Sequence, residues 1–187
     1  MIHDLRIAVI GAGVMGEAMI GGLLKQELVG PEQIIATEPR EGRRAEIAQR
    51  YGVRVTEDNI DAAHWAQVAI FSVKPQTLPK VLPELRGALK DGELVISIVA
   101  GAPIRHFVDG LGHSAIVRSM PNTPAQIGEG MTVWTAAEAV SEQQRGWART
   151  ILGSFGLELY VTMRTTWIWP PRSTAPARRM SLWCWRR

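Results

Sequence analysis

Short apolar runs alternate with amphipathic segments along most of this chain. The runs are rich in Val and Ile, whereas the segments between them repeat their apolar positions with helical spacing. This alternation predicts parallel strands joined by helices, an α/β fold. Strands are expected at 5–10, 33–38, 53–55, 67–73, 93–98, 115–118, 130–134 and 158–161. Helices are expected at 14–26, 41–51, 57–63, from Pro75 to about 89, at 104–111 and from a Ser141 cap to about 153.

A glycine-rich turn separates the first strand from the first helix. In such turns one glycine permits the tight bend, a second lets backbone amides approach phosphate, and a third lets the helix pack closely on the strand. The helix N-terminus then offers N–H groups and partial positive charge to an anion. A turn that binds nothing is the alternative. The candidate pyrophosphate site is Ile10, Gly11, Ala12, Gly13, Val14, Met15 and Gly16.

The end of the second strand carries conflicting signals about the coenzyme. Glu38 lies 22 residues beyond Gly16, where an acid accepts hydrogen bonds from ribose hydroxyls and favours NAD. Thr37 and Arg40 flank it, and an arginine there can pair with a 2′-phosphate and favour NADP. Routine charges at a strand end are the alternative interpretation.

Two later strands end at the same expected edge of the sheet. Ser72, Val73, Lys74 and Pro75 close one strand, and Lys74 is placed to reach a ribose or an anionic group, although a surface lysine is the commoner explanation. Small residues end the next strand and leave room for a flat nicotinamide ring, or serve a tight turn. They are Ile98, Val99, Ala100 and Gly101.

A proline-bracketed segment, 118–124, is predicted to form a rigid loop after a strand, with Met120, Pro121, Asn122 and Thr123 presented to a substrate. A plain turn without a ligand role is the alternative interpretation. The four histidines are scattered, so surface or helix-end positions are expected for them and no metal site. Their positions are 3, 64, 106 and 113. No Ser-His-Asp or Cys-His arrangement stands out, which suits hydride transfer better than hydrolysis.

The net charge of +3 is the sum of two unlike parts. Residues 162–187 hold six arginines and no acid, which leaves 15 basic against 18 acidic residues before them. The same segment holds four of the seven tryptophans and three prolines. We therefore expect one domain over 1–161 and a disordered tail over 162–187. Cys184 is the single cysteine of the sequence, so an internal disulfide is excluded. No apolar run has membrane-spanning length, and both observations suit a cytoplasmic protein.

Taken together, these motifs resemble pyrroline-5-carboxylate reductase. The resemblance covers 5–161, and its most specific part is the Met-Pro-Asn-Thr-Pro segment at 120–124. It implies a doubly wound, mostly parallel Rossmann-type sheet that holds NADP, with NAD as the alternative. It implies hydride transfer to the C5=N bond of 1-pyrroline-5-carboxylate, giving L-proline, in a homo-oligomer without nucleic-acid or membrane partners. It also assigns Thr37 and Asn59 to the adenosine side, and 72–75 with 98–100 to the nicotinamide ribose.

The C-terminal segment departs from that resemblance, because family members continue into a helical dimerisation domain with a Gly-Thr-Gly-Pro-Ala type segment. Read one base out of phase, the possible codons of 162–187 can spell such a segment. We hypothesise that the tail is a frameshift product and that the helical domain is missing. The alternative function is then a dinucleotide-binding fragment without turnover. The basic charge of the tail would have no nucleic-acid role.

Overall fold

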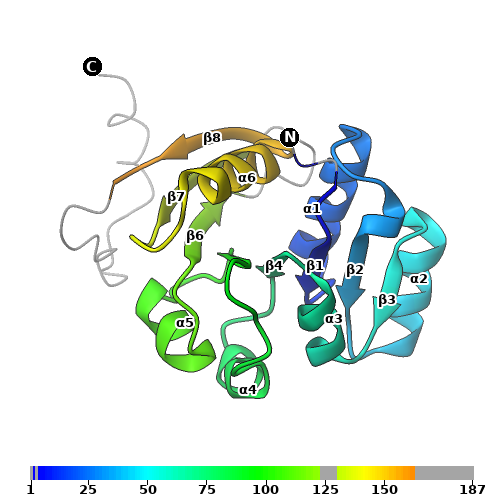
Figure 1. Ribbon diagram of the computed structural model, residues 1–187. Coiled ribbons are helices and arrows are strands. Elements are labelled where there is room, and N and C mark those ends of the chain that lie inside the picture. Colours follow the sequence, from blue (N-terminus) through cyan, green and yellow to red (C-terminus); the bar gives the residue numbers. More distant parts are fainter. Residues whose placement is uncertain (1, 3, 123–129, 163–187) are drawn as a thin grey trace, which may run out of the picture.

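The computed structural model describes residues 2, 4–122 and 130–162 (Figure 1). Among these residues, one eight-stranded sheet lies between two layers of helices. The strands are β1 (Ile7–Ile10), β2 (Ile34–Thr37), β3 (Arg54–Thr56), β4 (Val68–Phe71), β5 (Leu94–Ser97), β6 (Ile116–Pro121), β7 (Gly130–Ala136) and β8 (Gly156–Tyr160). The helices are α1 (Val14–Lys25), α2 (Glu41–Tyr51), α3 (Asn59–Trp65), α4 (Leu78–Glu84), α5 (Ile104–Leu111) and α6 (Glu142–Gly153), with a 3-10 turn, η1 (Pro31–Gln33).

The strand order β3-β2-β1-β4-β5-β6-β7-β8 has its switch point at β1. Strand β1 pairs in parallel with both β2 and β4, and the parallel pairing continues through β5 to β6. Strand β7 then pairs antiparallel to β6, and β8 pairs parallel to β7. The first six strands reproduce the doubly wound order that binds dinucleotides at the carboxyl ends of its strands. The predicted Rossmann-type, mostly parallel sheet is therefore confirmed.

The two faces of the sheet build two separate cores. Helices α1, α2 and α6 cover one face, where Met19, Ile47 and Ile151 are fully buried against residues such as Val9. Helices α3, α4 and α5 cover the other face over β1, β4, β5 and the start of β6. Each central strand is buried on both faces, which explains why these strands are almost wholly apolar in the sequence.

Three helices have the bounds that the sequence predicts: α2, α5 and α6. Helices α2 and α5 each end at a glycine in the left-handed conformation, Gly52 and Gly112, both with φ of +68°. The predicted Ser141 cap is also present. The Ser141 side chain accepts from the Gln144 backbone N–H, and the Gln144 side-chain oxygen accepts from the Ser141 backbone N–H. Helix α4 is shorter than expected, because the chain leaves the helix after Glu84 and turns at Gly87, where φ is +78°.

One sequence expectation is wrong, and another holds only in part. The segment 118–121 is not a loop: strand β6 runs on to Pro121, because β7 pairs with it from Val117 onward, Met120 with Val133 and Pro121 with Thr132. His113 lies at a helix end, just beyond the Gly112 C-cap of α5, but it is buried and not on the surface. One ring nitrogen of His113 lies 2.8 Å from the Glu93 carbonyl oxygen, a polar contact that makes burial acceptable.

Some expectations fall on residues outside the described ranges. They are the tail over 162–187, which is expected to be disordered and of which only Thr162 is described, and the positions of Thr123 and His3. Within the described ranges, no helix is long and apolar enough to cross a bilayer. The same ranges hold no group of three or more His, Cys, Asp or Glu side chains placed to bind a metal ion.

Candidate functional site

The glycine turn lies at the switch point, between β1 and α1. Gly11 has φ of +96°, which favours glycine, and a Cβ there would come within 2.9 Å of the Val73 side chain. At Gly16 a Cβ would lie 2.3 Å from the Gly11 carbonyl oxygen, so this glycine allows α1 to pack against the turn. Gly11 and Gly16 are therefore required by the fold itself.

Gly13 differs from both of them. A Cβ at Gly13 would meet no atom within 4 Å, and its backbone is extended, with φ of −71°. Gly13 is the N-cap of α1, and no side chain caps the helix there. The space in front of this helix N-terminus thus suits an anion bound by backbone N–H groups.

Ser72 supplies a second sign of a binding site. Its Oγ is buried and has no hydrogen-bond partner among the described residues, and it lies 2.8 Å from where a Gly16 Cβ would stand. A buried hydroxyl without a partner is costly, by about 1–3 kcal/mol. Together with the open space at Gly13, this orphaned hydroxyl beside the turn fits a bound dinucleotide that offers oxygen atoms at the carboxyl edge.

The hydroxyl and the carbonyl oxygen of Thr37 both accept hydrogen bonds from the glycine turn. Its Oγ1 accepts from the Gly11 N–H at 3.1 Å, and its carbonyl oxygen accepts from the Ala12 N–H at 2.8 Å. The residue is also buried. Thr37 therefore fixes the shape of the glycine turn, a structural role that the sequence did not indicate.

Glu38 and Arg40 form an ion pair with each other. The Arg40 Nε lies 2.8 Å from Glu38 Oε1, and the Arg40 backbone N–H also donates to this oxygen. Burial raises the pKa of the Glu38 carboxyl, but these hydrogen bonds and the Arg40 charge outweigh it, so the pKa is lowered overall. Arg40 is exposed while Glu38 is buried. The two residues that favour different coenzymes thus form one ion pair, in which the Arg40 guanidinium is exposed to solvent.

Another ion-pair cluster joins α1 to α2 behind the turn. The Glu17 carboxylate accepts from Arg43, from Arg50 and from the Tyr51 hydroxyl. Burial raises the pKa of Glu17, and these three hydrogen bonds more than reverse the effect, so its pKa is lowered. The cluster holds α2 against α1.

The predicted nicotinamide-side residues also gather at this edge. Lys74 and Pro75 are exposed after β4, and Ala100 and Gly101 are exposed after β5. Val99 beside them is buried, with its N–H donating to Ser97 Oγ at 3.2 Å. Asn59 is the first residue of α3, and its amide donates to Glu84.

Strand β6 ends at the same edge and carries the predicted substrate-side residues. Asn122 clamps the neighbouring strand, since its Oδ1 accepts from the Met131 N–H at 2.9 Å and its N–H donates to the Met131 carbonyl. Met120 projects from β6 and is exposed. Of the predicted set, Met120, Pro121 and Asn122 thus stand at the strand end, and Thr123 is outside the described ranges.

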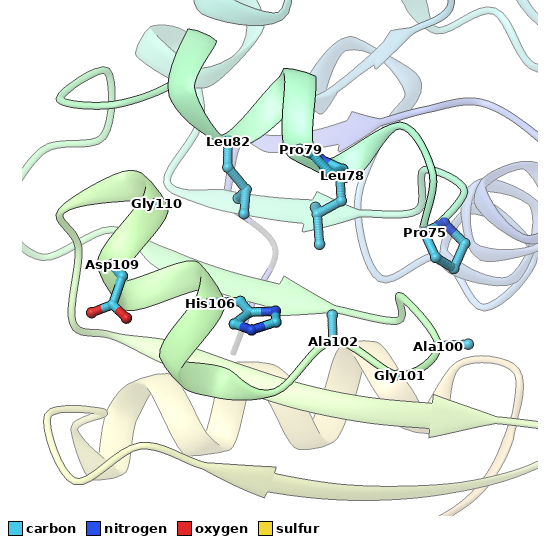
Figure 2. Close-up of a pocket in the computed structure, with 10 residues that line it drawn as sticks. All are labelled: Pro75, Leu78, Pro79, Leu82, Ala100, Gly101, Ala102, His106, Asp109 and Gly110. Carbon is cyan, nitrogen blue, oxygen red and sulfur yellow. The ribbon is translucent and has the colours of Figure 1, made fainter. Parts of the chain in front are cut away.

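A cleft of about 570 Å³ adjoins this edge between α4 and α5 (Figure 2). Pro75, Ala100 and Gly101 line one end, and Asp109 lies at the other, with His106 between them. The sequence analysis missed the contribution of α4 and α5, because the cleft depends on how the two helices pack. Gly110 sets that packing, because it approaches Leu82 so closely that a Cβ at Gly110 would come within 2.9 Å of the Leu82 side chain.

Fold and site thus define a dinucleotide-binding domain of an oxidoreductase. In agreement, the family model of NADP oxidoreductases, coenzyme F420-dependent, matches residues 6–101. A pyrroline-5-carboxylate reductase of Synechocystis sp. is 40% identical over 153 residues, covering 82% of this chain and 57% of that protein. The chain belongs to this oxidoreductase family and corresponds to the N-terminal NAD(P)-binding domain of pyrroline-5-carboxylate reductases.

Solved structures agree with the assignment. The pyrroline-5-carboxylate reductase of Coxiella burnetii is 31% identical, with a TM-score of 0.83, and the match covers 87% of this chain and 60% of that one. The Plasmodium falciparum pyrroline carboxylate reductase with NADP bound shares the fold, with a TM-score of 0.76 at 23% identity over 86% of this chain and 59% of that one. The chain therefore spans about three fifths of the length of these relatives.

Proposed function

We propose that this chain binds NADP(H) at the carboxyl edge of the sheet, with NAD(H) as the alternative coenzyme. The backbone at 10–16 holds the pyrophosphate in front of α1, with Ser72 as an additional donor. Arg40 pairs with the 2′-phosphate, while Thr37 and Asn59 lie on the adenosine side. Residues 72–75 and 98–101 line the nicotinamide ribose. The observation that carries the proposal is the uncapped helix N-terminus with open space at Gly13.

The proposed reaction is the reduction of 1-pyrroline-5-carboxylate to L-proline in the cytoplasm. Hydride passes to the C5 atom of the C5=N bond, and a proton on the ring nitrogen completes the amine. A protonated imine is already electrophilic, so positioning supplies most of the catalysis. Met120, Pro121 and Asn122, together with Thr123, are proposed to face the substrate from the end of β6.

The second candidate is a dinucleotide-binding domain without turnover. It is favoured by the share of the relatives that this chain spans, 57% of the Synechocystis protein. An assay of the purified chain with NADPH and 1-pyrroline-5-carboxylate discriminates between the two candidate functions. Proline formation above a no-enzyme control supports the reductase, whereas NADPH binding without proline formation supports the second candidate.

The choice of coenzyme is tested at the Glu38–Arg40 pair by titration calorimetry with NADPH and NADH. An arginine–phosphate pair is charge-assisted, so we expect Arg40→Ala to weaken NADPH about tenfold and NADH by much less. Arg6→Ala, a distant arginine that contacts Trp65, is the matched control and should change neither affinity. Equal weakening of both coenzymes by Arg40→Ala would refute the 2′-phosphate role.

A further inference from the structure

One arginine of α2 holds the loop 38–40, which carries Glu38 and Arg40. Three consecutive carbonyl oxygens of this loop accept hydrogen bonds from Arg44. The Arg44 guanidinium Nη1 donates to the Glu38 carbonyl at 2.8 Å and to the Pro39 carbonyl at 2.9 Å. The Arg44 backbone N–H donates to the Arg40 carbonyl at 3.0 Å. A single residue therefore binds every backbone carbonyl between the end of β2 and the start of α2.

These bonds fix the direction of the peptide planes in the loop 38–40. A peptide unit is planar, so holding its carbonyl oxygen also directs the N–H at the other end of the same unit. Both ends of the Pro39–Arg40 unit are held. Its carbonyl oxygen accepts from Arg44, and its N–H donates to Glu38 Oε1 at 3.3 Å. The backbone that presents the Arg40 side chain is therefore fixed in one orientation.

Arg44 also joins this loop to the neighbouring one. Its Nη1 lies 3.2 Å from Glu57 Oε2, in the turn between β3 and α3. The two loops are bonded at their bases too, since the Glu38 N–H donates to the Thr56 carbonyl oxygen at 3.1 Å. Asn59, which is proposed for the adenosine side, follows in this second segment as the first residue of α3. The Arg44 guanidinium thus contacts both segments that carry proposed adenosine-side residues.

Three arginines lie at the start of α2, and they differ in exposure. The Arg43 and Arg44 side chains are 21% and 18% exposed, and each is engaged by oxygen atoms of the protein. The Arg40 side chain is 72% exposed, and Glu38 is its only ion-pair partner among the described residues. An incoming 2′-phosphate therefore meets Arg40, while Arg44 holds the backbone from which Arg40 extends.

We propose that Arg44 is a positioning residue for coenzyme selection. It holds the loop 38–40 so that the Arg40 guanidinium meets the 2′-phosphate without having to be ordered first, and it does not touch the coenzyme itself. Ordering a loop and a long side chain on binding weakens affinity, so a loop that is fixed beforehand binds the phosphate more tightly. NADH has no 2′-phosphate and gains little from this order. This role of Arg44 rests on the proposed function, because it needs Arg40 to pair with the 2′-phosphate.

Titration calorimetry with NADPH and NADH measures the selectivity, defined as the ratio of the two association constants. We expect Arg44→Ala to lower the selectivity about fivefold, mainly by weakening NADPH. Arg44→Lys keeps the charge and can donate to one of the two carbonyls, so its loss should be about twofold. Arg43→Ala is the matched control, because it removes the same charge from the same turn of α2 and breaks two ion pairs. It should lower Tm and leave the selectivity unchanged.

A double-mutant cycle separates positioning from direct contact. If Arg44 acts through Arg40, Arg44→Ala has almost no effect once Arg40 is alanine, so the double variant should lose about tenfold, as Arg40→Ala alone does. Additive losses of about fiftyfold would overturn the proposal, because Arg44 would then contact the phosphate itself. So would an equal loss of selectivity in Arg43→Ala, because the lost charge alone would then explain it. Should Arg44→Ala fail to fold by circular dichroism, the same cycle with Arg44→Lys decides: its twofold loss should vanish in the Arg40→Ala background.

The Arg40→Ala variant tells the two possible failures apart. Unchanged selectivity in Arg40→Ala refutes the 2′-phosphate role, and the positioning role of Arg44 falls with it. A loss of selectivity in Arg40→Ala together with wild-type selectivity in folded Arg44→Ala refutes the positioning role alone and leaves the proposed function standing.

Discussion

Replacing Gly13 by alanine separates coenzyme binding from folding. The new methyl group would meet no protein atom within 4 Å, and the backbone there is extended, so the folded state accommodates it. The methyl group instead enters the space proposed for the pyrophosphate and blocks the approach of the neighbouring N–H groups. Each hydrogen bond to a charged group contributes about 1.5–3 kcal/mol, so losing one predicts roughly 10- to 150-fold weaker NADPH binding.

Gly16→Ala provides the contrast. Here the methyl group would lie 2.3 Å from a backbone oxygen, which cannot rotate away as a side chain can. Overpacking of this kind costs about 1–3 kcal/mol, or roughly 2–10 °C in Tm for a chain of this length. Gly16→Ala should therefore lose stability, whereas Gly13→Ala should keep its Tm within about 3 °C.

Calorimetry with NADPH and thermal melts followed by circular dichroism measure the two effects on the same preparations. Gly146→Ala, on α6, where the new methyl group would also meet no atom within 4 Å, is the control and should leave NADPH binding unchanged. Wild-type affinity in Gly13→Ala would refute the reasoning, because the anion would then bind elsewhere. A large loss of Tm in that variant would also refute it, since the space at Gly13 would then be needed by the protein itself.

Three further predictions concern stability, and thermal melts check each of them. Glu17→Gln should cost about 1.5–3 kcal/mol at pH 7, because both arginine partners lose a carboxylate. The folded-state pKa of Glu17 is lowered, so this difference should persist above the ordinary value of 4.5 and disappear as pH falls through the lowered pKa. Burial raises the pKa of Glu93, so the charged form is disfavoured in the fold; Glu93→Gln should therefore raise Tm above pH 7, with a gain that vanishes at low pH. Gly156→Ala should cost about 3 kcal/mol or more, since φ is +140° and the methyl group would lie 2.0 Å from the Gly130 carbonyl oxygen. A stable Gly156→Ala variant, or pH-independent effects at either glutamate, would contradict these arguments.

The parts of the fold that depend on local chemistry could be predicted from the sequence. The core strands are Val- and Ile-rich because helices cover both their faces. That composition identifies these segments as strands even when the neighbouring strands are not known. Helix ends at Gly52 and Gly112 follow from the left-handed conformation that glycine adopts easily. The glycine turn is equally local, since strand, turn and helix occupy consecutive residues.

The parts that depend on distant partners could not be predicted. Strand β6 continues to Pro121 only because β7 pairs with it, and nothing near Pro121 in the sequence indicates that partner. Glu38 and Arg40 favour different coenzymes when each is considered alone, and the sequence does not indicate that the two side chains form an ion pair. Thr37 carries a hydroxyl in a position typical of a ligand contact, yet that hydroxyl is used by Gly11.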